Sequence, residues 1–116
     1  MPDERILVAD DEARIVELCV HLLTKRGYKV RGVTSGHDAI ACLESESYDL
    51  LVVDIRMPDV DGLTVLRVGL AIDPNLTSVV ITGYATMGRV IEAMNSGARG
   101  FLLKPFDIKE LHAAVE

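Results

Sequence analysis

The sequence has little of what marks secreted or membrane proteins. Its 116 residues include only two cysteines, Cys19 and Cys42, which fall within helical patterns and form no metal-ligand spacing. This usage predicts buried free thiols in a reducing compartment. No apolar run approaches the length of a membrane span, and the charged amino terminus lacks the apolar stretch of a signal peptide. We therefore expect a cytoplasmic protein with no membrane partner.

Positive charge is also scarce. Lys and Arg number 12 against 18 Asp and Glu, so the formal net charge is −6. Nonspecific contact with nucleic acid needs clusters of basic residues, so we expect no direct nucleic-acid partner, and an acidic chain suits cations instead. The chain shows no repeat, linker or low-complexity segment. Its length and its 49% hydrophobic content predict one domain over residues 1–116, with a core that needs no disulfide.

Short apolar runs alternate with amphipathic stretches five times along the chain. The runs are Arg5–Ala9, Tyr28–Val33, Leu50–Val53, Val79–Ile81 and Phe101–Leu103. This alternation predicts an α/β fold with a doubly wound, five-stranded parallel sheet. The second run alternates apolar residues with Lys29 and Arg31, so it should lie at an edge, whereas the first, third and fourth should be interior. The predicted strand order is 2-1-3-4-5, the flavodoxin-like (βα)5 arrangement.

Periodicity and capping predict further helix positions. Ser35 and Asp61 are expected to cap the second and third helices. The core stripe of the first helix is predicted to be Ile15, Leu18, Cys19, Leu22 and Leu23. The core stripe of the fourth helix is predicted to be Met87, Val90, Ile91 and Met94. Three histidines are expected on solvated helix surfaces: His21, His37 and His112.

Polar residues follow four of the predicted strands and should meet at one edge of the sheet. They are Asp10 and Asp11, Asp54, Thr82 and Lys104. Three carboxylates that converge without a counter-charge repel one another and raise one another's pKa. A hard divalent cation relieves this repulsion, and all-oxygen ligands favour Mg²⁺ or Mn²⁺.

The same group of residues is suited to phosphoryl transfer. An ammonium group, a hydroxyl and nearby backbone amides can stabilise the charge on the oxygens of a transferring phosphoryl group. One carboxylate must then be the nucleophile, and Asp54, at the end of the central strand, is the candidate. Asp59 and Asp61, in the loop that follows, are predicted to be turn and cap residues rather than ligands.

Four motifs together resemble one known family over essentially the whole chain. They are Val8–Glu12, Val53–Gly62, Ile81–Tyr84 and Phe101–Phe106. The chain resembles a response-regulator receiver domain of two-component signalling. Within that family it is most similar to receivers that precede nitrogen-regulator-type transcription activators, which are driven by ATP.

The resemblance implies a role for each matching residue. Asp54 would accept the phosphoryl group, and the ligands of Mg²⁺ would be Asp11, Asp54 and the backbone carbonyl of Arg56, with Asp10 acting through water. Thr82 would be the switch hydroxyl, Lys104 the phosphate partner and Phe101 the aromatic switch, and the Lys104–Pro105 bond would be cis. Two residues beyond Asp54 and Thr82 lie Arg56 and Tyr84, which we expect to tune the lifetime of the phosphoryl group.

The resemblance also implies partners. The phosphodonor would be a sensor histidine kinase within a phosphorelay, and a second copy of the domain could bind after phosphorylation. The last predicted helix stops earlier than is usual in receivers, so the expectation is a fragment that lacks a carboxyl-terminal effector domain. The fourth helix, fifth strand and fifth helix should form the output face, with three exposed contact residues: Arg89, Glu92 and Arg99.

Three other interpretations compete with this one. A flavin-binding module of the same fold would need a phosphate loop where the chain has the acidic segment Asp10–Glu12. A small Mg²⁺-dependent aspartate-nucleophile phosphatase would have a second aspartate where Arg56 stands. A receiver that only binds proteins, independently of phosphorylation, would have lost a residue of the site, and none is lost.

Overall fold

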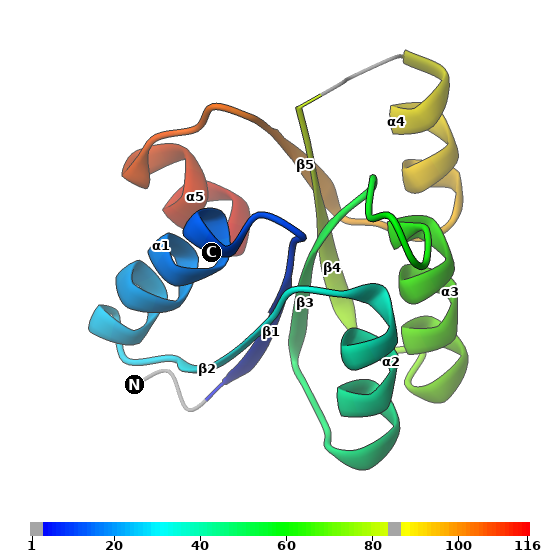
Figure 1. Cartoon of the computed structure of the whole chain (residues 1–116), viewed down its shortest axis with the longest axis horizontal. Coiled ribbons are helices and arrows are strands. Elements are labelled where there is room, and N and C mark those ends of the chain that lie inside the picture. Colours follow the sequence, from blue (N-terminus) through cyan, green and yellow to red (C-terminus); the bar gives the residue numbers. More distant parts are fainter. Residues whose placement is uncertain (1–3, 84–86) are drawn as a thin grey trace.

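Parallel strands and helices alternate along the chain in a computed structural model that describes residues 4–83 and 87–116 (Figure 1). The strands are β1 (Arg5–Ala9), β2 (Lys29–Val33), β3 (Leu50–Asp54), β4 (Thr77–Thr82) and β5 (Gly100–Leu103). The helices are α1 (Ala13–Lys25), α2 (Gly36–Ser45), α3 (Gly62–Ile72), α4 (Met87–Asn95) and α5 (Ile108–Val115). The sheet order is β2-β1-β3-β4-β5, which confirms the predicted fold and strand order.

Helices cover both faces of the sheet. In Figure 1, α1 and α5 lie on one side, and α2, α3 and α4 lie on the other. Because alternate strand residues point to opposite faces, Ile6 and Val8 pack with α1 and α5, whereas Leu7 and Ala9 pack in the other core. All five residues of β3 are buried, as expected for a strand covered on both faces.

The two edge strands differ in how their side chains are covered. β2 alternates between exposed and half-buried residues, which confirms its predicted edge position. β5 forms the opposite edge, where Leu102 is buried but Phe101 and Leu103 are each 45% exposed. An apolar surface is thus present at the β5 edge of the sheet.

The predicted helix signals act as expected. The Ser35 side chain accepts a hydrogen bond from the backbone N–H of Asp38, and the Asp61 side chain accepts one from that of Leu63. These bonds satisfy amides that have no partner within the first turn of a helix. Gly27 follows α1 with a φ of 98°, a left-handed conformation in which glycine is favoured.

Two predicted core stripes are partly wrong. On α1, Leu18 is 42% exposed and Val16 is buried in its place, because the face towards the sheet is set by Val16, Cys19 and Leu23. On α4, Val90 and Ala93 are buried, whereas Ile91 and Met94 are 51% and 40% exposed. The apolar residues of α4 therefore span more of its circumference than the sheet can cover. The side chain of Met87 lies outside the described residues.

The three histidines were predicted to be solvated, and one of them is not. His21 and His37 are exposed. His112 is half-buried, and its Nε2 is shielded from solvent. Among the residues that the structure describes, none of the helices combines the length and apolar character needed to cross a lipid bilayer.

Candidate functional site

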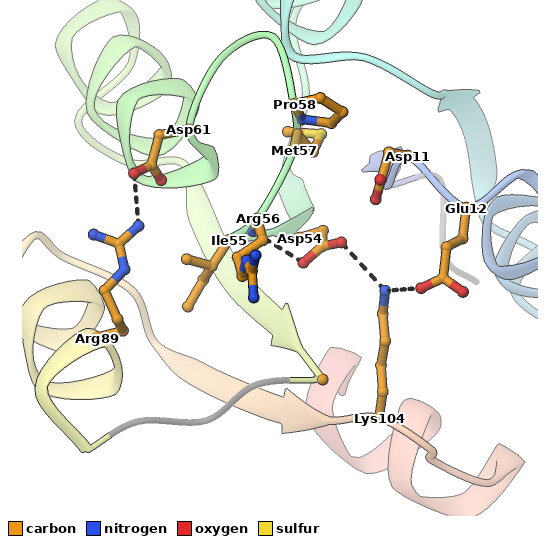
Figure 2. A pocket seen from close by; sticks show the side chains of 11 residues that line it. Asp11, Glu12, Asp54, Ile55, Arg56, Met57, Pro58, Asp61, Arg89 and Lys104 are labelled. Carbon is orange, nitrogen blue, oxygen red and sulfur yellow. Dashed lines mark hydrogen bonds and ion pairs between the residues drawn. The ribbon is translucent and has the colours of Figure 1, made fainter.

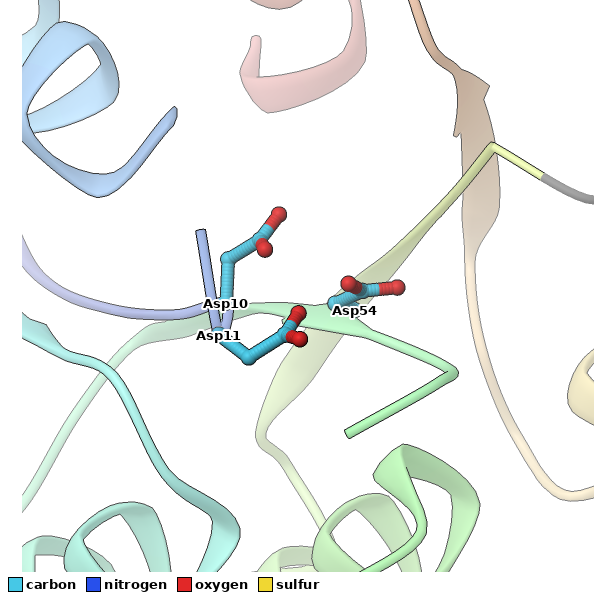
Figure 3. Close-up of side chains that lie close together, drawn as sticks. All are labelled: Asp10, Asp11 and Asp54. Carbon is cyan, nitrogen blue, oxygen red and sulfur yellow. The ribbon is translucent and has the colours of Figure 1, made fainter. Parts of the chain in front are cut away.

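Three carboxylates meet where β1 and β3 end. Asp10 and Asp11 follow β1, Asp54 is the last residue of β3, and these two strands are neighbours in the sheet. One oxygen atom from each of Asp10, Asp11 and Asp54 lies within 4.8 Å of the other two. Figure 3 shows the three side chains close together at the strand ends. Asp10 and Asp54 are buried and Asp11 is exposed, so solvent reaches the group from the side of Asp11.

Lys104 supplies the positive charge of the site. Its Nζ lies 2.8 Å from Asp10 Oδ2, 3.2 Å from Asp54 Oδ2 and 2.7 Å from Glu12 Oε1. Figure 2 shows the ammonium group between Asp54 and Glu12. Burial alone would lower the pKa of Lys104, but its hydrogen bonds to Asp10 and Glu12 raise that pKa above the usual value. Lys104 is therefore a permanent cation.

The carboxyl group of Asp54 is held in an unfavourable place for a negative charge. Burial and the nearby charge of Asp10 raise the pKa of Asp54 from 3.8 to about 6. Lys104 opposes this shift, and so does the Arg56 backbone N–H, which donates a hydrogen bond of 3.1 Å to Asp54 Oδ1. Asp54 is thus a carboxylate whose negative charge the site stabilises only in part.

A glycine lets the following loop fold back behind Asp54. A Cβ on Gly62 would lie 2.0 Å from the backbone oxygen of Asp54, which is a severe overlap. The Gly62 N–H also donates a hydrogen bond of 2.8 Å to the Ile55 carbonyl. This close approach fixes where α3 begins and therefore shapes the loop over residues 55–61, which forms one wall of the site.

The next two strands bring Thr82 and Lys104 to the same edge. Thr82, the last residue of β4, is 2% exposed, and its carbonyl accepts a hydrogen bond of 2.9 Å from the Lys104 backbone N–H. The Lys104–Pro105 bond is cis, which confirms the expectation from the family resemblance. Phe101 points outward on β5, and Tyr84 lies outside the described residues.

An open cleft of about 610 Å³ lies over the carboxylates. Its lining residues are Asp11, Glu12, Asp54, Ile55, Arg56, Met57, Pro58, Asp61, Gly83, Arg89 and Lys104. Figure 2 shows that Arg89 lies across the cleft from Asp11 and Glu12. The cleft is therefore a polar space with Asp11 and Glu12 on one side and the ion pair of Arg89 with Asp61 on the other.

The donor set fits a hard divalent cation. Three carboxylates contribute oxygen ligands at short separation, and the raised pKa of Asp54 is one sign of their repulsion. Oxygen-only ligands suit Mg²⁺ or Mn²⁺ rather than zinc. Asp11 and Asp54 line the cleft, whereas Asp10 lies beneath it in contact with Lys104. The roles of Asp11 as a direct ligand and of Asp10 as a ligand through water remain predictions.

Asp59 and Asp61 act as turn and cap residues, as predicted. Asp61 caps its own helix, α3. The two carboxylate oxygens of Asp59 accept hydrogen bonds of 3.0 and 2.9 Å from the backbone N–H groups of Gly36 and His37, at the start of α2. These bonds lower the pKa of Asp59 to about 2. The sequence did not reveal that Asp59 caps a different helix, because the contact joins distant segments.

Two charged residues at the cleft were given no role there from the sequence. Glu12 binds Lys104, and Arg89 was expected on the output face. Instead, Arg89 Nη2 lies 2.6 Å from Asp61 Oδ2, and its Nη1 lies 3.0 Å from Glu92 Oε1. Arg99 likewise bonds to the carbonyl of Ala114. The three predicted contact residues are therefore all engaged within the chain. The Arg89–Glu92 pair has the i,i+3 spacing of a helix ion pair, which the sequence does show, whereas the contacts of Arg89 with Asp61 and of Arg99 with Ala114 join distant segments.

Comparison with known families assigns the chain. The description "Response regulator receiver domain" belongs to the family whose sequence pattern matches residues 6–116. The chain belongs to the response regulator receiver family. It is thus a phosphoacceptor signalling module rather than a classical enzyme, and its three-carboxylate group is typical of the Mg²⁺ site of receivers.

Individual relatives agree with this assignment. The receiver is 33% identical to the transcriptional regulatory protein ZraR of Salmonella typhimurium over 96% of this chain, and spans about a quarter (25%) of ZraR. It is 34% identical over its whole length to the DNA-binding transcriptional regulator NtrC of Proteus hauseri, of which it covers 24%. These matches agree with the predicted resemblance to nitrogen-regulator-type activators.

A solved structure shows the same fold in a phosphorylated state. It is a response regulator protein from Burkholderia pseudomallei, described with a phosphorylated aspartic acid, a calcium ion and citrate. The two chains superpose with a TM-score of 0.91 at 27% identity, over 98% of this receiver and 67% of that protein.

Proposed function

We propose that Asp54 accepts a phosphoryl group from a sensor histidine kinase and that this modification switches the receiver between two states. The observation that carries this proposal is the position of Asp54 within a carboxylate group, with Lys104 Nζ 3.2 Å from its Oδ2. The family implies a kinase partner. The phosphorylated aspartate in the Burkholderia relative adds support.

Residues of the chain prepare the reaction. The Asp54 oxygen that faces the cleft attacks the phosphorus, and the bond to the donor's leaving atom breaks. Lys104 is already charged, so it can attract phosphoryl oxygens without having to gain a proton. A bound Mg²⁺ would neutralise negative charge on the phosphoryl oxygens, and we assign Asp11, Asp54, the Arg56 carbonyl and, through water, Asp10 to hold it.

Thr82 would convert the added charge into a change of conformation. A phosphoryl group adds a charge of about −2 near the end of β4. Reversing a population from 1:99 to 99:1 requires about 5.5 kcal/mol of differential binding. Charge-assisted hydrogen bonds contribute about 1.5–3 kcal/mol each, so Thr82, Lys104 and the backbone amide of Gly83 together contribute about 4.5–9 kcal/mol, a range that includes the required value with little to spare.

The output would appear on α4, β5 and α5. Inward movement of Thr82 would leave space for Phe101, which now points outward with 45% of its surface exposed. This face carries exposed apolar side chains: Ile91, Met94, Phe101, Leu103 and Ile108. We assign this face to contact with an effector domain or a second copy of the receiver. The chain spans about a quarter of the transcriptional regulators ZraR and NtrC. By analogy with these relatives, the effector domain that this face contacts would regulate transcription.

The test is phosphorylation by acetyl phosphate with Mg²⁺, followed by intact-mass measurement. The parent should gain one phosphoryl group and Asp54→Asn none. Asp59→Asn is the matched control, because it is the same substitution in the adjacent loop at a residue that caps α2. Labelling of Asp54→Asn at the parent's level would refute the assignment. Continuous consumption of the donor, many times faster than loss of the aspartyl phosphate, would instead favour the phosphatase alternative.

A further inference from the structure

Arg89 is one of three cations that line the cleft, with Arg56 and Lys104, and it is not committed to the carboxylate group. Lys104 is held by Asp10, Glu12 and Asp54, whereas Arg89 contacts none of the three carboxylates that form the metal-binding group. Arg89 lines the cleft, its side chain is about one-third exposed (36%), and its guanidinium contacts Asp61 and Glu92. Figure 2 shows Arg89 on the wall opposite Asp11 and Glu12, beyond Asp54 and Ile55.

A leaving group would depart into the open part of the cleft, which Arg89 borders. The acids and Lys104 take up the phosphoryl side of the cleft, at the base formed by the strand ends. In-line transfer places the leaving atom on the side of the phosphorus away from the attacking Asp54 oxygen, towards the open part of the cleft. A cation at the rim of that part attracts donors whose leaving group carries negative charge.

We propose that Arg89 is a specificity-determining residue that favours small acyl phosphates, whose leaving group is a carboxylate, over donors with a neutral leaving group. The proposal deepens the proposed function, because it concerns the same transfer to Asp54. In that step an Asp54 oxygen forms a bond to phosphorus, the bond between phosphorus and the acyl oxygen breaks, and the carboxylate leaves with the electron pair. No proton needs to move, and a divalent cation in solution is the co-reactant.

Asp61 would limit the effect of Arg89. Its Oδ2 lies 2.6 Å from Arg89 Nη2, while its Oδ1 accepts the capping hydrogen bond from the Leu63 N–H. Asn at position 61 can still accept that capping bond, but it has no charge to hold the guanidinium. Asp61→Asn should therefore make Arg89 more available to an anionic donor without unwinding the start of α3.

The chain contains a close control for Arg89. Arg67, on α3, contacts the same acid, Glu92, at 3.1 Å and also Ser96 at 3.3 Å. It is exposed and does not line the cleft. Arg67→Gln thus removes the same charge and a contact to the same carboxylate, but outside the cleft.

The experiment measures the second-order rate of phosphorylation with two donors at saturating Mg²⁺. Acetyl phosphate releases acetate, and phosphoramidate is less negatively charged and releases a neutral amine. Arg89→Gln should slow transfer from acetyl phosphate by about three- to tenfold and weaken its dependence on salt. Transfer from phosphoramidate should change by less than about twofold. Arg67→Gln should match the parent with both donors, and Arg89→Lys should recover most of the rate.

Further results separate the role of Arg89 from that of Asp54. Asp61→Asn should speed transfer from acetyl phosphate, and the gain should shrink when combined with Arg89→Gln. Equal slowing of both donors by Arg89→Gln, or no slowing of either, overturns the role of Arg89 while leaving Asp54 as the phosphoacceptor. A parent that neither donor labels overturns the proposed function itself, and the proposal for Arg89 with it.

Discussion

Two regions of the receiver meet at the carboxyl edge of the sheet and are built in opposite ways. The acid region comprises β1, β3 and the loops that follow them, and the output region comprises α4, β5 and α5. In β3 every residue is buried, including Asp54, whereas in β5 only Leu102 is buried. The acid region thus places charge in the interior, and the output region places apolar side chains at the surface.

This contrast suggests how the two regions divide the work. Buried charges store unfavourable electrostatic energy that a cation or a modification can relieve. Exposed apolar residues gain stability only when another surface covers them. Thr82 lies between the regions, since it ends β4, and its carbonyl is bonded to Lys104. We therefore expect phosphorylation to take place in the acid region and the conformational response to appear in the output region, with Thr82 coupling the two.

The largest expected effect separates coupling from chemistry. Thr82→Ala should still accept one phosphoryl group on Asp54, because the carboxylate that attacks and the Lys104 ammonium beside it are both retained. Phosphorylation should then no longer change the amide spectra of α4 and β5 or the tendency to self-associate, because the hydroxyl that the phosphoryl group would attract is gone. Nuclear magnetic resonance with and without acetyl phosphate measures this. Thr77→Ala, at the other end of β4, is the control, and a variant that switches like the parent would refute the coupling.

The second prediction compares the contributions of Asp10 and Asp11 to Mg²⁺ binding in the acid region. Asp10→Ala, which removes a ligand that acts through water, should weaken Mg²⁺ binding by about 10- to 100-fold, and Asp11→Ala should weaken it more, because only Asp11 of the two lines the cleft. Titration calorimetry or fluorescence would measure both affinities. Asp59→Ala, in the loop that follows β3, should bind Mg²⁺ like the parent because it caps α2. Equal losses for Asp10 and Asp11 would contradict this division.

Sequence reasoning succeeded where burial and chain-local signals decide the structure. The five apolar runs, the edge position of β2 and the caps by Ser35 and Asp61 were all predicted. Polar residues at strand ends in a parallel sheet must meet at one edge, so the carboxylate group could also be predicted.

Sequence reasoning failed mainly where a side chain's surroundings depend on distant segments. The apolar stripe of α4 was assigned to the core, but Ile91 and Met94 are exposed, because periodicity does not tell how much of a helix the sheet covers. Arg89 was assigned to the output surface, and its contact with Asp61 crosses 28 residues of sequence. The roles of Tyr84 and the output face remain predictions.

The third prediction concerns the energy stored in the acid region. Because the folded pKa of Asp54 is about 6 and its ordinary value is 3.8, the folded state holds this proton more tightly than the unfolded state. The free energy of unfolding should therefore fall as pH rises from about 4 to about 6. Without divalent cation at pH 7, Asp54→Asn should be more stable than the parent by about 1–3 kcal/mol.

Chemical denaturation of the parent and of Asp54→Asn over pH 4–7 measures this difference in the free energy of unfolding. The extra stability of Asp54→Asn should vanish near pH 4. Added Mg²⁺ should reduce the difference at pH 7 by stabilising the parent. Asp59→Asn should have the opposite effect and lower the stability at neutral pH. The Asp59 carboxylate is stabilised by backbone N–H groups, which lower its pKa to about 2. A loss of stability in Asp54→Asn at neutral pH would show that the buried charge is not a source of strain.

The smallest expected effect tests whether the acid region alone sets the lifetime of the signal. Arg56 is exposed, lines the cleft and lies two residues after Asp54, where its side chain can hinder or admit the water that attacks the aspartyl phosphate. Arg56→Ala should change the dephosphorylation rate by about two- to tenfold, well below the roughly 100- to 10,000-fold of a general acid or base, since Arg56 would only hinder or admit the water and transfer no proton. The backbone N–H that bonds to Asp54 is retained in this variant, so one phosphoryl group should still be accepted. Loss of mass over time measures the half-life, with Arg67→Ala as the control outside the cleft. A half-life equal to the parent's would move control of the lifetime away from Arg56 and towards the output region.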